Sequence, residues 1–182
     1  YLSPLLQVPF TLVDGAFSGV VDSTELNAVV QPGIAYGDLN NDGIEDAAFV
    51  LAENSGGSGV FNSLLAVYSD AGQYTQAQGV IIDDRPVIDS VSIEDGVVKV
   101  QALVHAPNDA MVNPTTRMSA EYSLWGSKLV QTRLNSRFGG GGEHAIYIDM
   151  PRDGESVSGS LRVTGSMPIA PFENNLSLLI SD

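Results

Sequence analysis

The residues best suited to chemistry lie between positions 38 and 46, where oxygen-bearing side chains alternate along a short stretch. Asp38, Asn40 and Asp42 are spaced by two, Gly43 follows the third of them, and Asp46 closes the run. Alternate residues of a tight loop can point inward together, and Ca²⁺ takes about six to eight oxygen ligands. Glycine permits the sharp turn because it adopts positive φ without a steric penalty. The spacing predicts a calcium loop, and the alternative is a surface turn rich in Asp, Asn and Gly that holds no metal.

The predicted calcium ligands are four side chains and one backbone carbonyl. They are the side chains of Asp38, Asn40, Asp42 and Asp46 and the carbonyl of Ile44. The loop is not an EF-hand, because Phe49 stands where that motif requires a bidentate Glu. The apolar run that follows Asp46 has the length of a strand.

Residues 37–48 read Gly-Asp-Leu-Asn-Asn-Asp-Gly-Ile-Glu-Asp-Ala-Ala. This stretch resembles the calcium loops of FG-GAP repeats, which form the blades of integrin α-subunit propellers. The resemblance implies a bound Ca²⁺ and a buried strand after the loop. A propeller needs several blades at regular spacing, whereas the stretch occurs once, so a propeller is not predicted.

Further oxygen-bearing side chains are candidates for the calcium shell. Asp83 and Asp84, or Glu53 and Asn54, could reach the loop from neighbouring strands. The alternative is that Asp83-Asp84 forms a turn, since neighbours in a strand point to opposite faces and do not build an acid–base pair.

The two histidines offer little for catalysis. His105 with Asp109 could bind a metal or act as a base, or could cap a loop, and His144 borders a glycine-rich stretch. No Gly-x-Ser-x-Gly nucleophile elbow, phosphate-binding loop or His-Glu-x-x-His motif is present. The sequence predicts a protein that is not an enzyme, with a secreted hydrolase using Asp, Glu or His105 as a remaining alternative.

The charge of the chain restricts its partners. The net charge is −14, and no Lys or Arg precedes Arg85 although half of the acidic residues do. Nucleic acids and anionic membranes attract basic surfaces, so neither is a predicted partner. An acidic field suits cation binding and solubility outside the cell.

The expected cellular compartment of the protein is inferred from its calcium loop and not from its cysteine content. Cysteine is absent, which excludes disulfides and zinc–thiolate sites. Extracellular calcium would fill a weak loop of this kind, whereas the far lower cytosolic concentration would leave it empty. The chain begins at Tyr1 without a signal peptide or a bilayer-spanning apolar run, so we expect a processed or trimmed exported protein.

Short apolar or alternating runs separated by Gly, Asp, Asn and Pro predict an all-β or β-dominated α+β fold, arranged as an antiparallel meander or sandwich. The expected strands and hairpins are, in chain order, a strand at 10–13, a strand or helical turn at 26–30, a hairpin of 47–52 with 60–69, strands within 73–82, a hairpin of 87–93 with 97–104 turning at 94–96, and a hairpin of 118–125 with 129–134.

A run of four glycines marks the predicted domain boundary. Residues 137–144 form a linker, because consecutive glycines cannot pack a core. We therefore predict a calcium-loop domain at 1–136 and a second segment at 145–182 with strands at 145–150, 161–164 and 175–180. The second segment carries Ile146, Pro151, Gly154 and Val157 at fixed spacing, then Ser-Leu-Arg-Val-Thr-Gly at 160–165 and Pro-Phe-Glu-Asn-Asn-Leu at 171–176.

This second segment resembles an immunoglobulin-like domain of bacterial sporulation, germination and envelope proteins. Such a sandwich needs about seven strands and about 100 residues, and the segment has fewer than half of these residues. Either the chain is a fragment of a longer protein, or another chain completes the strands. In the second case, strand exchange through this segment or through the arm at 1–10 would join subunits into a filament.

The first domain, from Phe10 to about Gln131, also resembles a module of exported bacterial proteins and lipoproteins. The matching stretches are 37–48, Leu-Ala-Glu-Asn-Ser-Gly-Gly-Ser-Gly at 51–59, Val-Ser-Ile-Glu-Asp-Gly at 91–96 and His-Ala-Pro-Asn-Asp at 105–109. The resemblance implies a location in the bacterial envelope or outside the cell and brings no activity. The resulting prediction is a non-catalytic, calcium-stabilised structural or adhesion module, with an extracellular filament subunit as the alternative.

Overall fold

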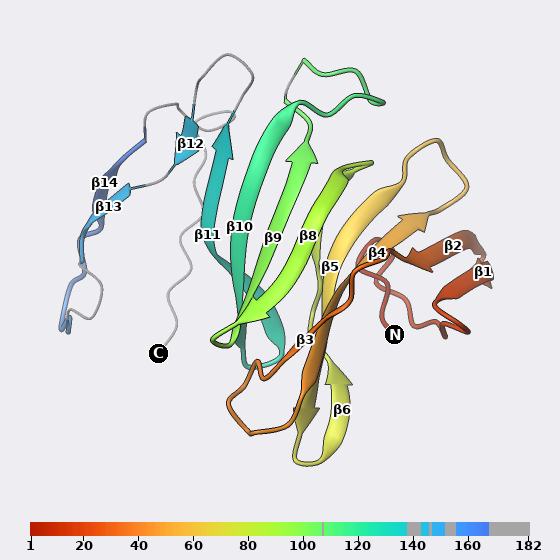
Figure 1. Cartoon of the computed structure of the whole chain (residues 1–182), viewed down its shortest axis with the longest axis horizontal. Helices are drawn as coiled ribbons and strands as arrows, with labels where there is room; N and C mark the ends of the chain where they lie inside the picture. The colour runs from red at the N-terminus through yellow and green to blue at the C-terminus, as the bar shows by residue number, and fades with distance from the viewer. Residues whose placement is uncertain (107, 138–142, 146, 152–155, 168–182) are drawn as a thin grey trace.

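The computed structural model describes residues 1–106, 108–137, 143–145, 147–151 and 156–167 (Figure 1). These residues form β-strands and no α-helix, so the predicted all-β fold is confirmed. Every named pair of neighbouring strands is antiparallel. In this described part of the chain, no helix is long and apolar enough to cross a membrane.

The first sheet contains the N-terminal half of the chain. Its strands are β1 (Ala16–Val21), β2 (Thr24–Val30), β3 (Ala35–Gly37), β4 (Asp46–Asn54), β5 (Phe61–Asp70), β6 (Gln73–Gln76) and β7 (Val80–Asp84). The order is β1-β2-β4-β5-β6, with β3 paired to β4 and β7 paired to β5. The long strands β4 and β5 therefore form the centre of this sheet.

The second sheet is a meander of five strands. They are β8 (Val87–Glu94), β9 (Val97–Val104), β10 (Thr116–Trp125), β11 (Lys128–Arg137) and β12 (Glu143–Ala145). Their order in space is β12-β11-β10-β9-β8. A separate two-stranded sheet follows, formed by β13 (Tyr147–Met150) and β14 (Thr164–Ser166).

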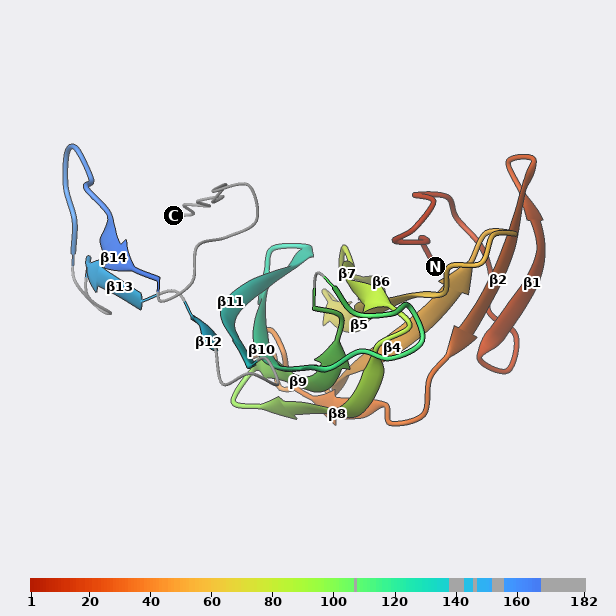
Figure 2. The ribbon, with the colours of Figure 1, turned by 90° about the horizontal axis from the view of Figure 1, so that it is seen from above.

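The two large sheets pack around a shared core. Figure 2 shows β8–β11 as an arc that curves around β5 and β7. The first sheet contributes apolar side chains such as Leu64 and Tyr68, and the second contributes Val98, Val100 and Tyr122. Removal of this apolar surface from water is the main force that holds the sheets together. A β-sandwich is the result.

The two sheets differ in how many of their faces are covered. In β4 and β5 most residues are buried, including consecutive ones, which explains their continuous apolar runs. In β9 and β10 buried residues alternate with more exposed ones, so only one face of these strands packs on the core. The second sheet therefore presents a polar outer face to solvent.

An N-terminal arm covers the far face of the first sheet. Phe10 is buried there with Leu26, Phe49 and Leu65 in a second core cluster. The backbone N–H of Phe10 donates to the carbonyl of Tyr1 at 2.8 Å, which closes the arm into a loop. The arm thus packs on its own chain.

The predicted hairpins of β4 with β5, β8 with β9, and β10 with β11 are confirmed. Residues 26–30 belong to the strand β2 rather than to a helical turn. The strand predicted at 10–13 is wrong, because Phe10 to Leu12 pair with no strand and Val13 makes only an isolated bridge to Ala16. Phe10 is apolar because it fills the core, not because it belongs to a sheet.

The predicted linker at 137–144 meets strands at both ends. Arg137 ends β11, and Glu143 begins β12, which pairs back onto β11. Residues 138–142 lie outside the described part. In the second segment, β13 lies within the strand predicted at 145–150. The strand predicted at 161–164 overlaps β14 only at Thr164. The strand predicted at 175–180 lies outside the described residues.

Candidate functional site

The acidic loop connects two strands that lie side by side. It leaves β3 at Gly37 and enters β4 at Asp46, and these two residues are paired partners in the first sheet. Leu39 is buried in the core between the sheets and anchors the start of the loop. The loop is therefore closed at its base, which limits the positions that its side chains can take.

Side-chain oxygens inside the loop converge on its backbone. The N–H of Asp42 donates to Asp38 Oδ1 and to Asn40 Oδ1, both at 3.2 Å. The N–H of Gly43 donates to Asp38 Oδ2 at 2.8 Å, and that of Ile44 donates to Asp42 Oδ1 at 2.8 Å. The structure thus brings together the side chains of Asp38, Asn40 and Asp42, as the spacing predicts.

Asp46 has a different environment from the other predicted ligands. Its side chain is buried, with 1% of the residue exposed. Oδ2 accepts the N–H of Leu39 and Oδ1 accepts the N–H of Ser69 at the end of β5, each at 2.8 Å. The amide of Asn40 also reaches this strand, donating to the Ser69 carbonyl at 2.6 Å. Asp46 and Asn40 therefore fasten the loop to β5.

In the described part of the chain, no three acidic, histidine or cysteine side chains are gathered into a metal-holding group. The oxygens of Asp38 and Asp42 instead face backbone N–H groups of the loop. A hydrogen-bonded carboxylate oxygen keeps a second lone pair, so these bonds leave acceptor capacity for a cation. The donor set is made of hard oxygens, which is the chemistry that Ca²⁺ prefers.

The turn between β8 and β9 lies against the start of the acidic loop. This contact was not predicted from the sequence. A Cβ atom added at Gly96 would lie 3.7 Å from the backbone oxygen of Asp38. Asp95, the residue before it, has a positive φ of 51°. This turn brings further acidic residues to the end of the sandwich where Asp38 lies.

The additional ligands considered for the loop lie at the wrong end of the sheet. Glu53 and Asp84 are paired with Phe61, at the opposite end of β5 from Ser69. Seven strand steps of about 3.3 Å separate Asp46 from Glu53, so the gap is about 23 Å. Asp83, Asp84, Glu53 and Asn54 therefore do not belong to the calcium loop.

His105 pairs with Asp83 and not with Asp109. Its Nδ1 lies 2.9 Å from Asp83 Oδ2, which also accepts the backbone N–H of His105 at 2.7 Å. Its Nε2 is buried and has no hydrogen-bond partner among the described residues. The sequence suggests His105 together with Asp109, whereas the structure places the hydrogen bond of the ring on Asp83.

Asp109 instead organises the loop after β9. It accepts the backbone N–H groups of Ala106 and Thr115 at 2.9 and 2.8 Å and the hydroxyl of Thr115. The bond from the Ala106 N–H, followed by those from Thr115, lowers the pKa of Asp109. The carboxylate is thus a loop cap.

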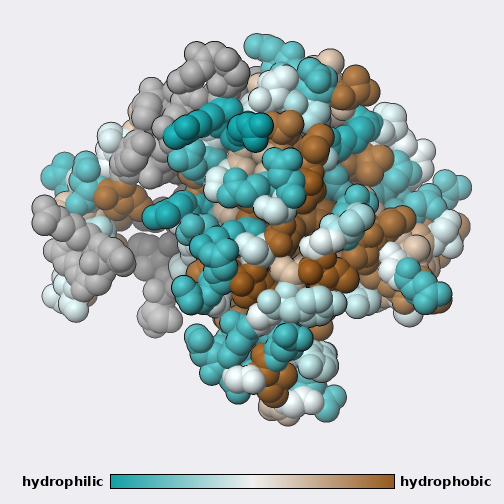
Figure 3. Space-filling model, viewed as in Figure 1, coloured by the Kyte–Doolittle hydropathy of each residue, from teal (hydrophilic) through white to brown (hydrophobic). Residues whose placement is uncertain are grey.

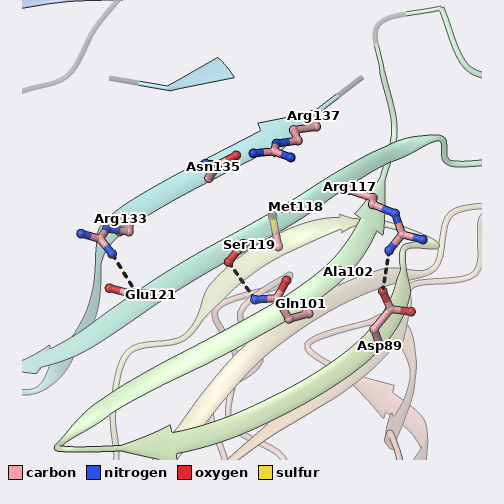
Figure 4. Close-up of a pocket in the computed structure, with 10 residues that line it drawn as sticks. All are labelled: Asp89, Gln101, Ala102, Arg117, Met118, Ser119, Glu121, Arg133, Asn135 and Arg137. Carbon is pink, nitrogen blue, oxygen red and sulfur yellow. Dashed lines mark hydrogen bonds and ion pairs between the residues drawn. The ribbon is translucent and has the colours of Figure 1, made fainter. Parts of the chain in front are cut away.

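A polar groove of about 370 Å³ lies on the outer face of the second sheet (Figure 4). It is lined by Asp89, Gln101, Ala102, Arg117, Met118, Ser119, Glu121, Arg133, Asn135 and Arg137. Hydrophilic residues gather over the β9–β11 part of the face shown in Figure 3. The sequence pattern did not predict this groove.

The strand register aligns the groove residues in rows. Arg117 is opposite Arg137, Ser119 is opposite Asn135, and Glu121 is opposite Arg133. Gln101 donates to Ser119 Oγ at 2.7 Å. Arg133 lies 3.5 Å from Glu121, whereas the contact of Arg117 with Asp89 is longer, at 3.9 Å.

A sequence signal for the groove exists, but it is weak. Residues 117, 119 and 121 read Arg, Ser and Glu, and residues 133, 135 and 137 read Arg, Asn and Arg. Polar residues at every second position are typical of the solvent-exposed face of any antiparallel strand. Only the register shows that the two patterns face each other.

Comparison of the chain with known protein families, characterised proteins and solved structures finds no match. The resemblances to FG-GAP loops, to an immunoglobulin-like domain and to an exported bacterial module therefore stay predictions.

Proposed function

We propose that this chain is a non-catalytic, calcium-stabilised structural or adhesion module of the bacterial envelope or extracellular space. The observation that carries the proposal is the acidic loop, in which Asp38, Asn40 and Asp42 present side-chain oxygens within a closed turn. The ion would be held by these three side chains with the Ile44 carbonyl and Asp46. An extracellular setting supplies the calcium concentration that a weak loop requires.

Electrostatics support a cation at this place. Asp38 and Asp42 are close in a loop that contains no basic residue, and the β8–β9 turn adds acidic residues beside them. Like charges raise the free energy of the folded loop, and a divalent ion offsets their repulsion. Calcium would thereby rigidify the connection between β3 and β4.

The environment of His105 supports the non-catalytic part of the proposal. A general base needs a nitrogen within reach of the proton that it removes. The Nε2 atom of His105 is buried, so a substrate proton cannot reach it, and the contact of Nδ1 with Asp83 only orients the ring. This histidine joins β9 to β7, which is a structural role.

The test is thermal unfolding in chelator, in millimolar Mg²⁺ and in millimolar Ca²⁺. A ligand that binds only the folded state at about 100 times its Kd adds about 2.7 kcal/mol to the free energy of unfolding. We expect Ca²⁺ to raise the melting temperature of the wild type and not that of Asp42→Ala. Glu45→Ala, which removes a neighbouring exposed carboxylate, should keep the calcium response.

Two results would reject the calcium proposal. One is a wild-type melting temperature that is the same in chelator and in Ca²⁺. The other is an equal calcium response in Asp42→Ala and Glu45→Ala, which would show that the ion binds elsewhere.

A second candidate, a filament subunit, is favoured by the sheet of β13 and β14. Large apolar side chains of this segment are exposed, with Ile148 at 58% and Met150 at 43%. Strands with unpaired edges recruit further strands. The N-terminal arm is the weaker route, since it already packs on its own chain.

Light scattering and electron microscopy of the purified chain test this candidate. Concentration-dependent assembly that Ile148→Lys abolishes would support it. A monomer at all concentrations would oppose it. The exposed Val20→Lys, on β1 of the first sheet, is the control for a loss of surface apolar area alone.

A further inference from the structure

The N-terminal arm, residues 1–10, is a small closed unit on the far face of the first sheet. The N–H of Ser3 donates to the carbonyl of Val8 at 2.9 Å, and that of Phe10 donates to the carbonyl of Tyr1 at 2.8 Å. These bonds are internal to the arm. A single two-stranded unit of this size is at best marginally stable on its own in water. The arm therefore keeps its shape only while contacts with the sheet hold it.

Two contacts between uncharged groups attach the arm to the sheet. The side-chain amide of Gln76 on β6 accepts the N–H of Leu2 at 2.7 Å and donates to the Leu2 carbonyl at 2.9 Å. Phe10 is buried with Phe49, and the ring of Tyr1 meets that of Phe49 edge-on with centroids 6.1 Å apart. These contacts do not depend on the protonation of a carboxyl group.

The third contact is a buried hydrogen bond between Ser3 and Glu53 on β4. The Ser3 hydroxyl donates to Glu53 Oε1 and accepts the N–H of Leu6 at 2.9 Å, so it joins the carboxyl group to the turn of the arm. Both Ser3 and Glu53 are 0% exposed, and Glu53 Oε2 has no hydrogen-bond partner among the described residues. A buried carboxylate with an unpartnered oxygen costs free energy that a neutral carboxyl group does not.

Other charged groups near the site do not remove this cost. Besides Glu53, the titratable residues of the arm, β2, β4 and β5 are Tyr1, Glu25, Asp46 and Asp70. Asp46 and Asp70 lie at the other end of the sheet from Glu53. The carboxylate of Glu25 lies against Gly56, and the amino group of Tyr1 donates to the Phe10 carbonyl at 2.7 Å. Burial is the largest cause of the raised pKa of Glu53, so the cost of charging it is not offset.

We propose that residues 1–10 form a strap that is closed on the first sheet while the Glu53 carboxyl group is protonated and opens when this group ionises. Opening gives the carboxylate access to water, which solvates its charge. It also uncovers apolar side chains of the second core cluster, among them Phe49 and Leu65.

The direction of the pH dependence follows from the raised pKa of Glu53 in the closed state. The opening equilibrium increases as pH rises above the ordinary pKa of 4.5, by up to about tenfold per pH unit. It levels off above the pKa of the closed state, where Glu53 is ionised in both forms. The strap is therefore most firmly closed in acid.

Hydrogen exchange of the whole chain, read by mass spectrometry between pH 4.5 and pH 8, tests the strap. The wild type is compared with Glu53→Gln at each pH, because their ratio removes the intrinsic pH dependence of exchange. We expect the ratio of wild-type to variant exchange in the arm to rise severalfold with pH. This should occur at labelling times for which β9 and β10 stay protected in both proteins, since local opening precedes global unfolding.

Two serine variants and a dye complete the experiment. Ser3→Ala removes the buried hydrogen bond and should raise exchange in the arm at every pH. Ser18→Ala removes an exposed hydroxyl that donates to Asn27 at 2.6 Å in the same sheet, and it should leave the arm unchanged. A hydrophobic fluorescent dye should bind the wild type more strongly than Glu53→Gln at pH 8, and both equally at pH 4.5.

Three results would overturn the proposal. The first is a ratio of wild-type to Glu53→Gln exchange in the arm that stays constant with pH. The second is exchange of the arm that is as slow as that of β10 at every pH, which would show that the arm opens only when the whole chain unfolds. The third is an equal effect of Ser3→Ala and Ser18→Ala on the arm.

Discussion

The carboxylate of Asp46 accepts the backbone N–H of Ser69 at 2.8 Å in a site that solvent hardly reaches. Its other oxygen accepts the N–H of Leu39 at the same distance. One side chain at the start of β4 thereby holds the acidic loop on one side and the end of β5 on the other. Asp46 is a structural element of the fold whether or not the loop contains a cation.

Asp46→Ala should destabilise the protein even in chelator. The substitution leaves two buried N–H groups without acceptors, and each such loss costs about 1–3 kcal/mol. We expect the free energy of unfolding to fall by about 3 kcal/mol in urea titrations. Glu45→Ala, at the exposed neighbouring position, should change it by less than about 0.5 kcal/mol. Similar values for the two variants would contradict this role of Asp46.

Gly37 allows the chain that leads into the loop to pass close to β8. A Cβ atom at this position would lie 2.6 Å from Cγ2 of Ile93, which is shorter than a normal contact. Gly37→Ala should therefore destabilise the protein by about 1–3 kcal/mol. Adding Ile93→Ala removes the clashing atom, so the double variant should lose less than the sum of the two single losses. Strict additivity would show that the contact is not the cause.

Gly43 is needed for its backbone conformation. Its φ is 81°, and a Cβ atom there would meet nothing within 4 Å. Alanine in the left-handed region costs about 1–2 kcal/mol, so Gly43→Ala should lower the free energy of unfolding by that amount. Gly57 has the same open surroundings but no positive φ. Gly57→Ala should be neutral, and chemical denaturation of both variants measures the difference.

Glu53 should make stability depend on pH. It is fully buried, and desolvation raises its pKa above the ordinary 4.5, although a hydrogen bond from Ser3 opposes this shift. The folded state therefore binds a proton more tightly than the unfolded state. The resulting stability is present below pH 4.5 and is lost as pH rises through the folded-state pKa.

Urea midpoints between pH 4 and pH 8 measure this effect as the difference between the wild type and Glu53→Gln, which is always neutral. The wild type should lose stability relative to the variant as pH rises. Ser3→Ala removes the bond that favours the charged carboxylate and should strengthen the pH dependence. Parallel curves for the wild type and Glu53→Gln would contradict a raised pKa.

The local sequence determined much of the fold. Asp95-Gly96 and Gly126 mark turns between alternating strands, and the structure places the hairpins of β8 with β9 and β10 with β11 there. The spacing of Asp38, Asn40 and Asp42 likewise brings their oxygens together, because a closed loop of a few residues has little freedom. These features depend on neighbours in the chain, so one sequence is enough to predict them.

Only the tertiary structure decided which distant residues meet. Phe10 has the apolar character of a strand residue, but it belongs to the N-terminal arm and packs in the second core cluster. Burial and strand pairing favour the same residue types, so the residue alone does not distinguish the two. His105 faces Asp83 and not the nearby Asp109 because the packing of the two sheets brings β7 beside the end of β9. The polar groove is lined by residues that only the register brings opposite each other, such as Glu121 and Arg133. Register is set by core packing across whole strands, and no short segment of the sequence contains that information.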